Sequence, residues 1–127
     1  MNIADPAHPF QAARLTLNAN LFDLAIEENY LYVAAGLRGL LIIDVSNVPY
    51  VAGTYRPTLD ADVDAEGVCV IDHLVYATFE FGGLYLINAS SPQLPTLLGK
   101  YHGEDNFTSV VVKGNHAYLT SDYKKEF

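Results

Sequence analysis

A run of alternating acidic residues is the part of this sequence that most resembles a site for chemistry. It reads Asp60-Ala61-Asp62-Val63-Asp64-Ala65-Glu66. In an extended segment alternate side chains point the same way, so Asp60, Asp62 and Asp64 would offer calcium a row of oxygen ligands. The EF-hand pattern needs Gly and Glu at its sixth and twelfth positions, where Ala65 and Ile71 stand. We favour the alternative, a solvated acidic loop that keeps a sheet edge soluble.

A second candidate is the segment His102-Gly103-Glu104-Asp105. Together with the acidic run it offers one imidazole and several carboxylates, which is enough in principle for the metal site of a hydrolase. No close spacing such as His-x-x-x-His or Cys-x-x-Cys supports a metal site, and no Gly-x-Ser-x-Gly or phosphate-binding glycine loop occurs. We therefore expect a polar turn here and a protein that is not an enzyme.

The composition restricts the class of partner. Half of the 127 residues are apolar and 17% are charged, which is typical of one folded domain. The formal net charge of −8 argues against nucleic acid or an anionic membrane as partner. The apolar runs are only strand-length, so we expect no membrane insertion. The opening MNIADPAHPF is unlike a signal peptide, and the lone Cys69 leaves the compartment open.

The elements that would position these residues are repeated along the chain. Residues 30–46 read YLYVAAGLRGLLIIDVS, and residues 74–90 read LVYATFEFGGLYLINAS. Tyr32 and Tyr76 are 44 residues apart, as are Gly39 and Gly83, and a third copy begins at residues 115–122 with Tyr118. A fixed period of this length is the signature of a repeat architecture.

Each copy divides into four short runs rich in Val, Ile, Leu and Tyr, separated by Gly, Pro, Asn and Asp. This pattern predicts strands joined by hairpins, and therefore an all-β fold. The opening residues 1–17 share the Pro-x-x-Pro spacing of residues 92–95 and therefore predict another fourth strand, which would make eleven strands in all. The loop at residues 56–67, which carries the acidic run, is an insertion relative to the other inter-repeat loops.

The segments GLLIIDVSNVPYVAGTY, GLYLINASSPQLPTLLGKY and VVVKGNHAYLTSD resemble the LVIVD repeat. The resemblance implies four-stranded antiparallel blades of a β-propeller, a family found largely in bacterial and archaeal surface or secreted proteins, and no shared catalytic residues. A closed propeller needs four or more blades, so we expect an incomplete propeller. The expected single domain, 1–127, comprises a last strand of a preceding blade (1–17), blade one (21–56), blade two (67–102) and a partial blade three (107–127).

These observations favour a non-catalytic binding or scaffolding module, expected to be a fragment of a larger surface or secreted protein. The alternative is a calcium-binding module or metal-dependent hydrolase that uses residues 60–66 with His102. Calcium is the only cofactor that the sequence suggests. Two and a half blades leave apolar ends open, so we expect a protein partner or self-association through those ends. Because Tyr32, Tyr76 and Tyr118 recur at one repeat position, we expect them to pack between blades.

Overall fold

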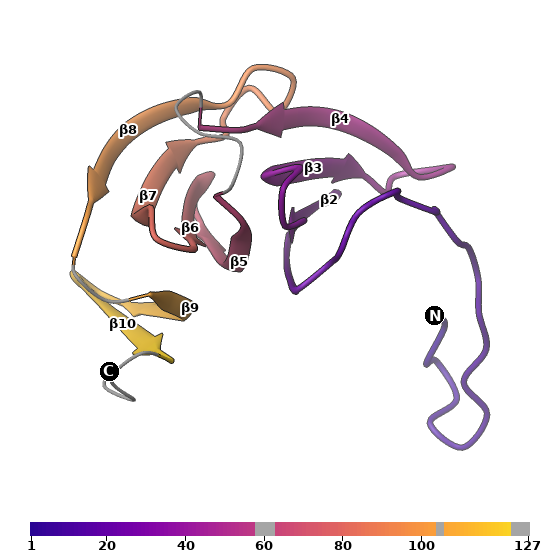
Figure 1. Ribbon diagram of the computed structural model, residues 1–127. Helices are drawn as coiled ribbons and strands as arrows, with labels where there is room; N and C mark the ends of the chain where they lie inside the picture. Colours follow the sequence, from indigo (N-terminus) through magenta and orange to yellow (C-terminus); the bar gives the residue numbers. More distant parts are fainter. Residues whose placement is uncertain (58–62, 104–105, 123–127) are drawn as a thin grey trace.

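Three antiparallel sheets make up the computed structural model, which describes residues 1–57, 63–103 and 106–122 (Figure 1). Blade one contains β1 (Asp23–Glu27), β2 (Tyr30–Ala34), β3 (Leu40–Asp44) and β4 (Tyr50–Tyr55). Blade two contains β5 (Ala65–Ile71), β6 (Leu74–Phe79), β7 (Gly83–Asn88) and β8 (Thr96–Tyr101). Blade three contains β9 (Phe107–Lys113) and β10 (His116–Ser121). The all-β, incomplete-propeller prediction is confirmed.

Several residues that recur between the two repeats form the turns of each blade. Gly39 directly precedes β3 and Gly83 begins β7, with φ values of 78° and 97°, and an added Cβ would collide with the carbonyl oxygen of Tyr55 or Tyr101 in the outer strand. At the end of the third strand, the side-chain oxygen of Asp44 or Asn88 accepts a bond of 2.9 Å from the backbone N–H two residues later. These bonds turn the chain toward the fourth strand.

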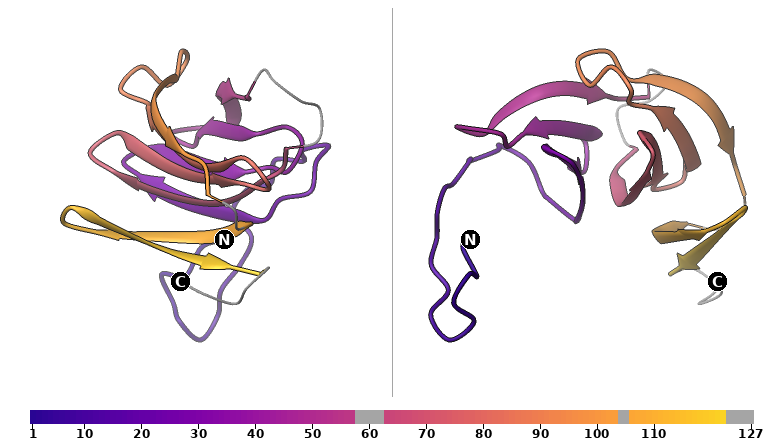
Figure 2. Two further views of the ribbon diagram at one scale, coloured as in Figure 1. Left: turned by 60° about the vertical axis from the view of Figure 1, so that its left-hand side comes forward. Right: turned by 180° about the vertical axis from the view of Figure 1, so that it is seen from behind.

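The blades form an open arc, with β5 inside and β4 and β8 outside (Figure 1). The views in Figure 2 show the sheets packed face to face, with the N-terminal segment and β10 at the two ends of the arc. Strand order within each complete blade runs from the innermost to the outermost strand, β1-β2-β3-β4 and β5-β6-β7-β8. Each sheet must therefore present an apolar surface to both neighbours.

The largest core lies between blades one and two. Tyr32, Leu40 and Ile42 of blade one pack against residues of blade two that include Val75 and Phe79. Polar contacts fix the register of the same joint. The Ala65 N–H donates to the Gly36 carbonyl oxygen at 2.9 Å, and the Val68 N–H donates to an Asp23 carboxylate oxygen at 3.1 Å. The two blades thus form one packed unit.

The N-terminal segment differs from the sequence prediction. Residues 1–17 form no strand, and their only ladder contact is an isolated bridge between Asn2 and Phe10. A fourth strand needs the third strand of its own blade to accept its hydrogen bonds, and the described residues supply no such strand before β1. Leu15 and Leu17 instead pack on blade one beside Val33 and Leu41.

In the part of the chain that the structure describes, no helix has the length and apolar character needed to cross a bilayer.

Candidate binding surface

Each end of the arc carries a sheet face that no neighbouring blade covers within the described residues. At the blade-one end the N-terminal segment buries part of this face, at Val33, Leu41 and Ile43, and leaves Leu24 and Ile26 exposed. We call the side of blade one that points away from blade two the head face; it is formed by Leu24, Ile26, Leu31, Val33, Leu41 and Ile43. We call the side of blade three that points away from blade two the tail face; it carries Val111 and Tyr118. The head face is the side of a blade that carries Leu24, and the tail face is the side that carries the repeated tyrosine. Wherever two blades touch inside the chain, one contributes a side of the first kind and the other a side of the second kind.

Part of the head face is exposed because the large apolar side chains of β1 all point to that side of the strand. In Asp23–Glu27 the two large apolar side chains, Leu24 and Ile26, point outward and are each 62% exposed. Across the hairpin they are paired with Val33 and Leu31 on the same face. Val68 occupies the repeat position of Leu24 and is 4% exposed, because blade one covers it. The head face is therefore an inter-blade surface without a blade on it.

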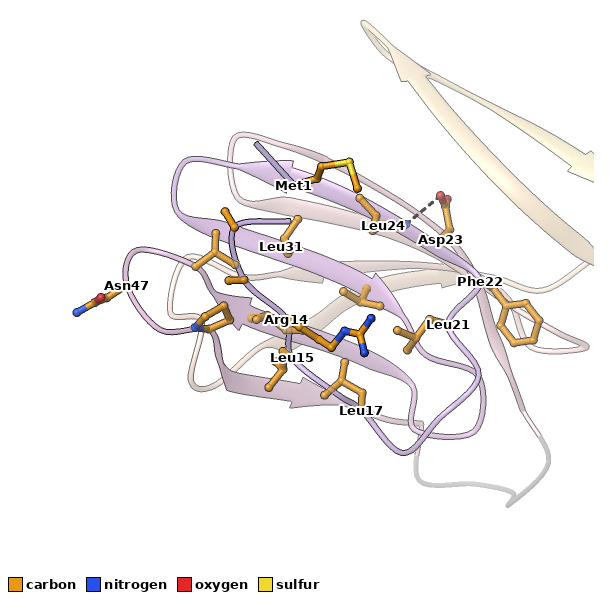
Figure 3. A pocket seen from close by; sticks show the side chains of 16 residues that line it. Met1, Arg14, Leu15, Leu17, Leu21, Phe22, Asp23, Leu24, Leu31 and Asn47 are labelled. Carbon is orange, nitrogen blue, oxygen red and sulfur yellow. Dashed lines mark hydrogen bonds between the residues drawn. The ribbon is translucent and has the colours of Figure 1, made fainter. Parts of the chain in front are cut away.

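A groove of about 790 Å³ lies between the head face and the N-terminal segment (Figure 3). Its walls are mainly apolar, with Leu15 and Leu17 on one side and Leu24 and Leu31 on the other. Arg14 and Asp23 are the charged side chains along it. Apolar walls with a few fixed charges are typical of a surface that binds another molecule.

The tail face shows the same property at the other end. Tyr118 is 51% exposed and Val111, its cross-strand partner, is 61% exposed. Tyr32, at the same repeat position in blade one, is 1% exposed, and Tyr76 in blade two is half-buried. We call Tyr32, Tyr76 and Tyr118 the tyrosine column. The exposed fraction of these side chains is smallest where a four-stranded blade covers the tyrosine, larger under the two-stranded blade three, and largest at the tail face, which no blade covers within the described residues. The prediction that the column packs between blades is thus met at Tyr32 and only partly at Tyr76.

Comparison with known proteins adds a family to this geometry. A family model for the LVIVD repeat matches residues 21–55, which span blade one. Blade one is thus similar to the LVIVD repeat. Blade two has the same strand order, the same glycine at the start of its third strand and the same side-chain turn after it. No curated protein and no solved structure gave a significant match to the chain.

Blades two and three also place three carboxylates within electrostatic range of a fourth carboxyl group. Glu66 in β5 faces the carboxylates of Glu80, Asp122 and Asp64. Partial burial, the negative charges around it and a hydrogen bond with Glu80 together raise the pKa of Glu66 to about 7. The joint between blades two and three therefore holds a carboxyl group that keeps its proton near neutral pH.

The structure separates the residues for which chemistry was predicted. Asp60, Asp62, Glu104 and Asp105 lie outside the described residues, whereas Asp64 and His102 lie within them. The Asp64 carbonyl oxygen accepts a bond of 2.7 Å from the Glu80 N–H, so its backbone extends the pairing of β5 with β6. The His102 ring lies 3.0 Å from the Phe81 carbonyl oxygen, which is a contact to backbone.

No metal centre is assembled within residues 1–57, 63–103 and 106–122, where no three His, Cys, Asp or Glu side chains are grouped so that they could hold an ion. The calcium site at Asp60, Asp62 and Asp64 stays a prediction, because two of its three residues lie outside the described part. Of the remaining histidines, His8 contacts Asp5 at 2.9 Å and His73 contacts Glu27 at 3.1 Å. The first contact lies within the N-terminal segment, and the second joins neighbouring blades.

Sequence reasoning missed two features of these surfaces. The head face was indicated by Leu24 and Ile26, large apolar residues that stand at the repeat positions of Val68 and Val70. The group of carboxylates was indicated by Glu80 and Asp122, which directly follow the second strands of successive repeats and so lie at the same edge of neighbouring blades. Only the packing of the blades shows that Glu66 lies close to both.

Proposed function

We propose that this chain is a non-catalytic LVIVD-type module that serves binding or scaffolding, and that the head face is its principal binding surface. The exposed apolar pair Leu24 and Ile26, beside a groove of about 790 Å³, is the observation that carries the proposal. An exposed apolar surface of this kind gains free energy when a partner removes it from water. The setting that fits the family resemblance is extracytoplasmic.

Two further observations support a binding role over catalysis. The LVIVD repeat is not a known catalytic family. One wall of the groove comes from β1, β2 and β3 of a sheet, and such an element holds a recognition surface in place with little loss of entropy on binding. The charged side chain of Arg14 lies beside the apolar walls and would orient a partner.

The proposal is tested with an apolar fluorescent dye such as ANS. The measurement is made at a protein concentration low enough that light scattering gives the mass of a single chain. We expect the chain to bind the dye and the double variant Leu24→Asp with Ile26→Asp to lose most of the fluorescence. Leu98→Asp is the matched control, because Leu98 is 63% exposed on the outer strand β8, away from both ends. The proposal fails if the folded chain binds no dye, or if the double variant and the control behave alike.

A further inference from the structure

The same blade-on-blade interface occurs twice inside the chain. Blade one presents the face that carries Tyr32 to the face of blade two that carries Val68, and β5 lies against β1 and β2. Blade two in turn presents the face that carries Tyr76 to blade three, where β9 lies against β5 and β6 and Val110 is buried. Every joint thus places a tyrosine-bearing face on a face rich in branched aliphatic residues.

The tail and head faces are the two halves of a third interface of this kind. Tyr118 and Val111 on the tail face occupy the repeat positions of Tyr32 and Ala25 on blade one. On the head face, Leu24 and Ile26 stand at the repeat positions of Val68 and Val70, which blade one covers. The two halves lie at opposite ends of one chain, on sheets that face away from each other along the arc (Figure 1).

Charge at the edge of the joint favours the same pairing. In the interior, Glu27 at the end of β1 accepts a bond of 2.9 Å from the His73 N–H, in the β5–β6 turn of the next blade. Lys113 stands at the repeat position of Glu27 on the tail side. Glu28, in the β1–β2 turn, stands at the repeat position of Asp72 and shares its left-handed backbone, with φ values of 54° and 49°. A blade docked in the same way would bring Lys113 beside Glu28, two opposite charges.

We infer that the tail face of one chain packs on the head face of a second copy, and that two copies joined reciprocally close a ring of six blades. The inference rests on the proposed function, because it names the partner of the head face. An interface between unlike surfaces closes into a ring when the rotation between subunits allows it, and six blades lie within the usual range for propellers. The ring places each Tyr118 where the interior buries Tyr32.

Light scattering and analytical ultracentrifugation of the 127-residue chain test the inference. We expect the mass of a dimer in the micromolar range and of a single chain on dilution. Leu24→Asp and Tyr118→Asp, one on each face, should each abolish the dimer, because each places an unpaired charge inside the interface. A single chain throughout the micromolar range, or a dimer that survives both substitutions, overturns the inference.

A charge exchange tests the orientation of the two copies. Lys113→Glu and Glu28→Lys should each weaken association about tenfold by placing like charges at the joint. The double variant, and an equimolar mixture of the two single variants, should recover it, because both restore an opposite pair at each of the two joints. Lys100→Glu is the matched control, since it makes the same charge change on the outer strand β8. If neither the double variant nor the mixture recovers association, the proposed orientation is wrong.

These experiments separate the inference from the proposed function. If the chain binds the dye through Leu24 and Ile26 but stays monomeric, the proposed binding surface is supported and the proposed dimer is wrong. A chain that dimerises through both faces supports the two proposals together. A chain that neither binds the dye nor dimerises overturns both.

Discussion

The joint between blades one and two and the two ends of the arc present the same repeat positions in opposite surroundings. Val68 is 4% exposed in the joint, whereas Leu24 is 62% exposed on the head face. Tyr32 is 1% exposed in the joint, whereas Tyr118 is 51% exposed on the tail face. The residue types are alike at each pair of positions. Burial in this architecture is therefore decided by whether a neighbouring blade is present and how large it is, and not by the residue itself.

The polar contacts of the joint have no counterpart at the ends within the described residues. Asp23 and Glu27 each accept a backbone N–H from blade two and so tie the innermost strands of neighbouring blades together. A sheet that has an apolar surface on both sides needs such contacts, because apolar packing alone does not fix the angle between two blades. The joint is thus both packed and aligned, whereas the end faces have no polar contact of this kind to a neighbouring blade within the described residues.

The largest effect is expected from one charge placed at equivalent positions in the joint and at the end. Val68→Asp should lower the free energy of unfolding by about 4 kcal/mol or more, because it buries an unpaired carboxylate. Leu24→Asp should change it by less than about 0.5 kcal/mol in dilute solution, because water still reaches the side chain. Urea unfolding monitored by circular dichroism measures both. Similar losses at the two positions would mean that the head face is covered in the single chain.

The tyrosine column gives a graded version of the same comparison. Tyr32→Ala should cost about 3–5 kcal/mol, as is usual for a buried aromatic residue. Tyr118→Ala should cost less than about 1 kcal/mol, and Tyr76→Ala, in the middle blade, should fall between them. Thermal and urea unfolding of the three variants in dilute solution measure the order. Equal, small effects would show that the column does not pack between blades.

The joint between blades two and three should respond to pH through Glu66. Its pKa is about 7 in the folded chain against an ordinary value of 4.5. Between these pH values the folded chain holds a proton that the unfolded chain releases, so the free energy of unfolding should fall as pH rises and level off above about 7. Glu66→Gln should flatten this decline and stabilise the protein at pH 8 by about 1 kcal/mol, a figure reduced for solvent screening. An unchanged pH profile in Glu66→Gln would contradict this account.

The smallest effect is expected from calcium. We expect millimolar calcium to leave the melting temperature unchanged, because a ligand raises it only if it prefers the folded chain. Differential scanning calorimetry with and without calcium measures the shift. A rise that disappears in Asp62→Asn with Asp64→Asn would contradict this expectation and establish a site in the acidic run.

Much of each blade could be predicted from the sequence, because its determinants are local. The glycines at the start of the third strands, the Asp44 and Asn88 turns and the runs of Val, Ile and Tyr act within a few residues of their own positions. Residues 1–17 could not be predicted in this way. Their sequence resembles that of a fourth strand. A strand forms, however, only when a neighbouring strand accepts its hydrogen bonds, and the described residues supply no such strand before β1.

The sequence by itself determined the repeat, the all-β class, the antiparallel blades and the positions of their turns, because each depends on short-range sterics and side-chain periodicity. Only the tertiary structure decided which of the repeated apolar residues are covered. It places Leu24 and Ile26 in water and Val68 in a core, and it brings Glu66 near Glu80 and Asp122. The physical reason is that burial and electrostatic coupling depend on contacts between blades, and the identity of a residue does not record whether a neighbouring blade is there.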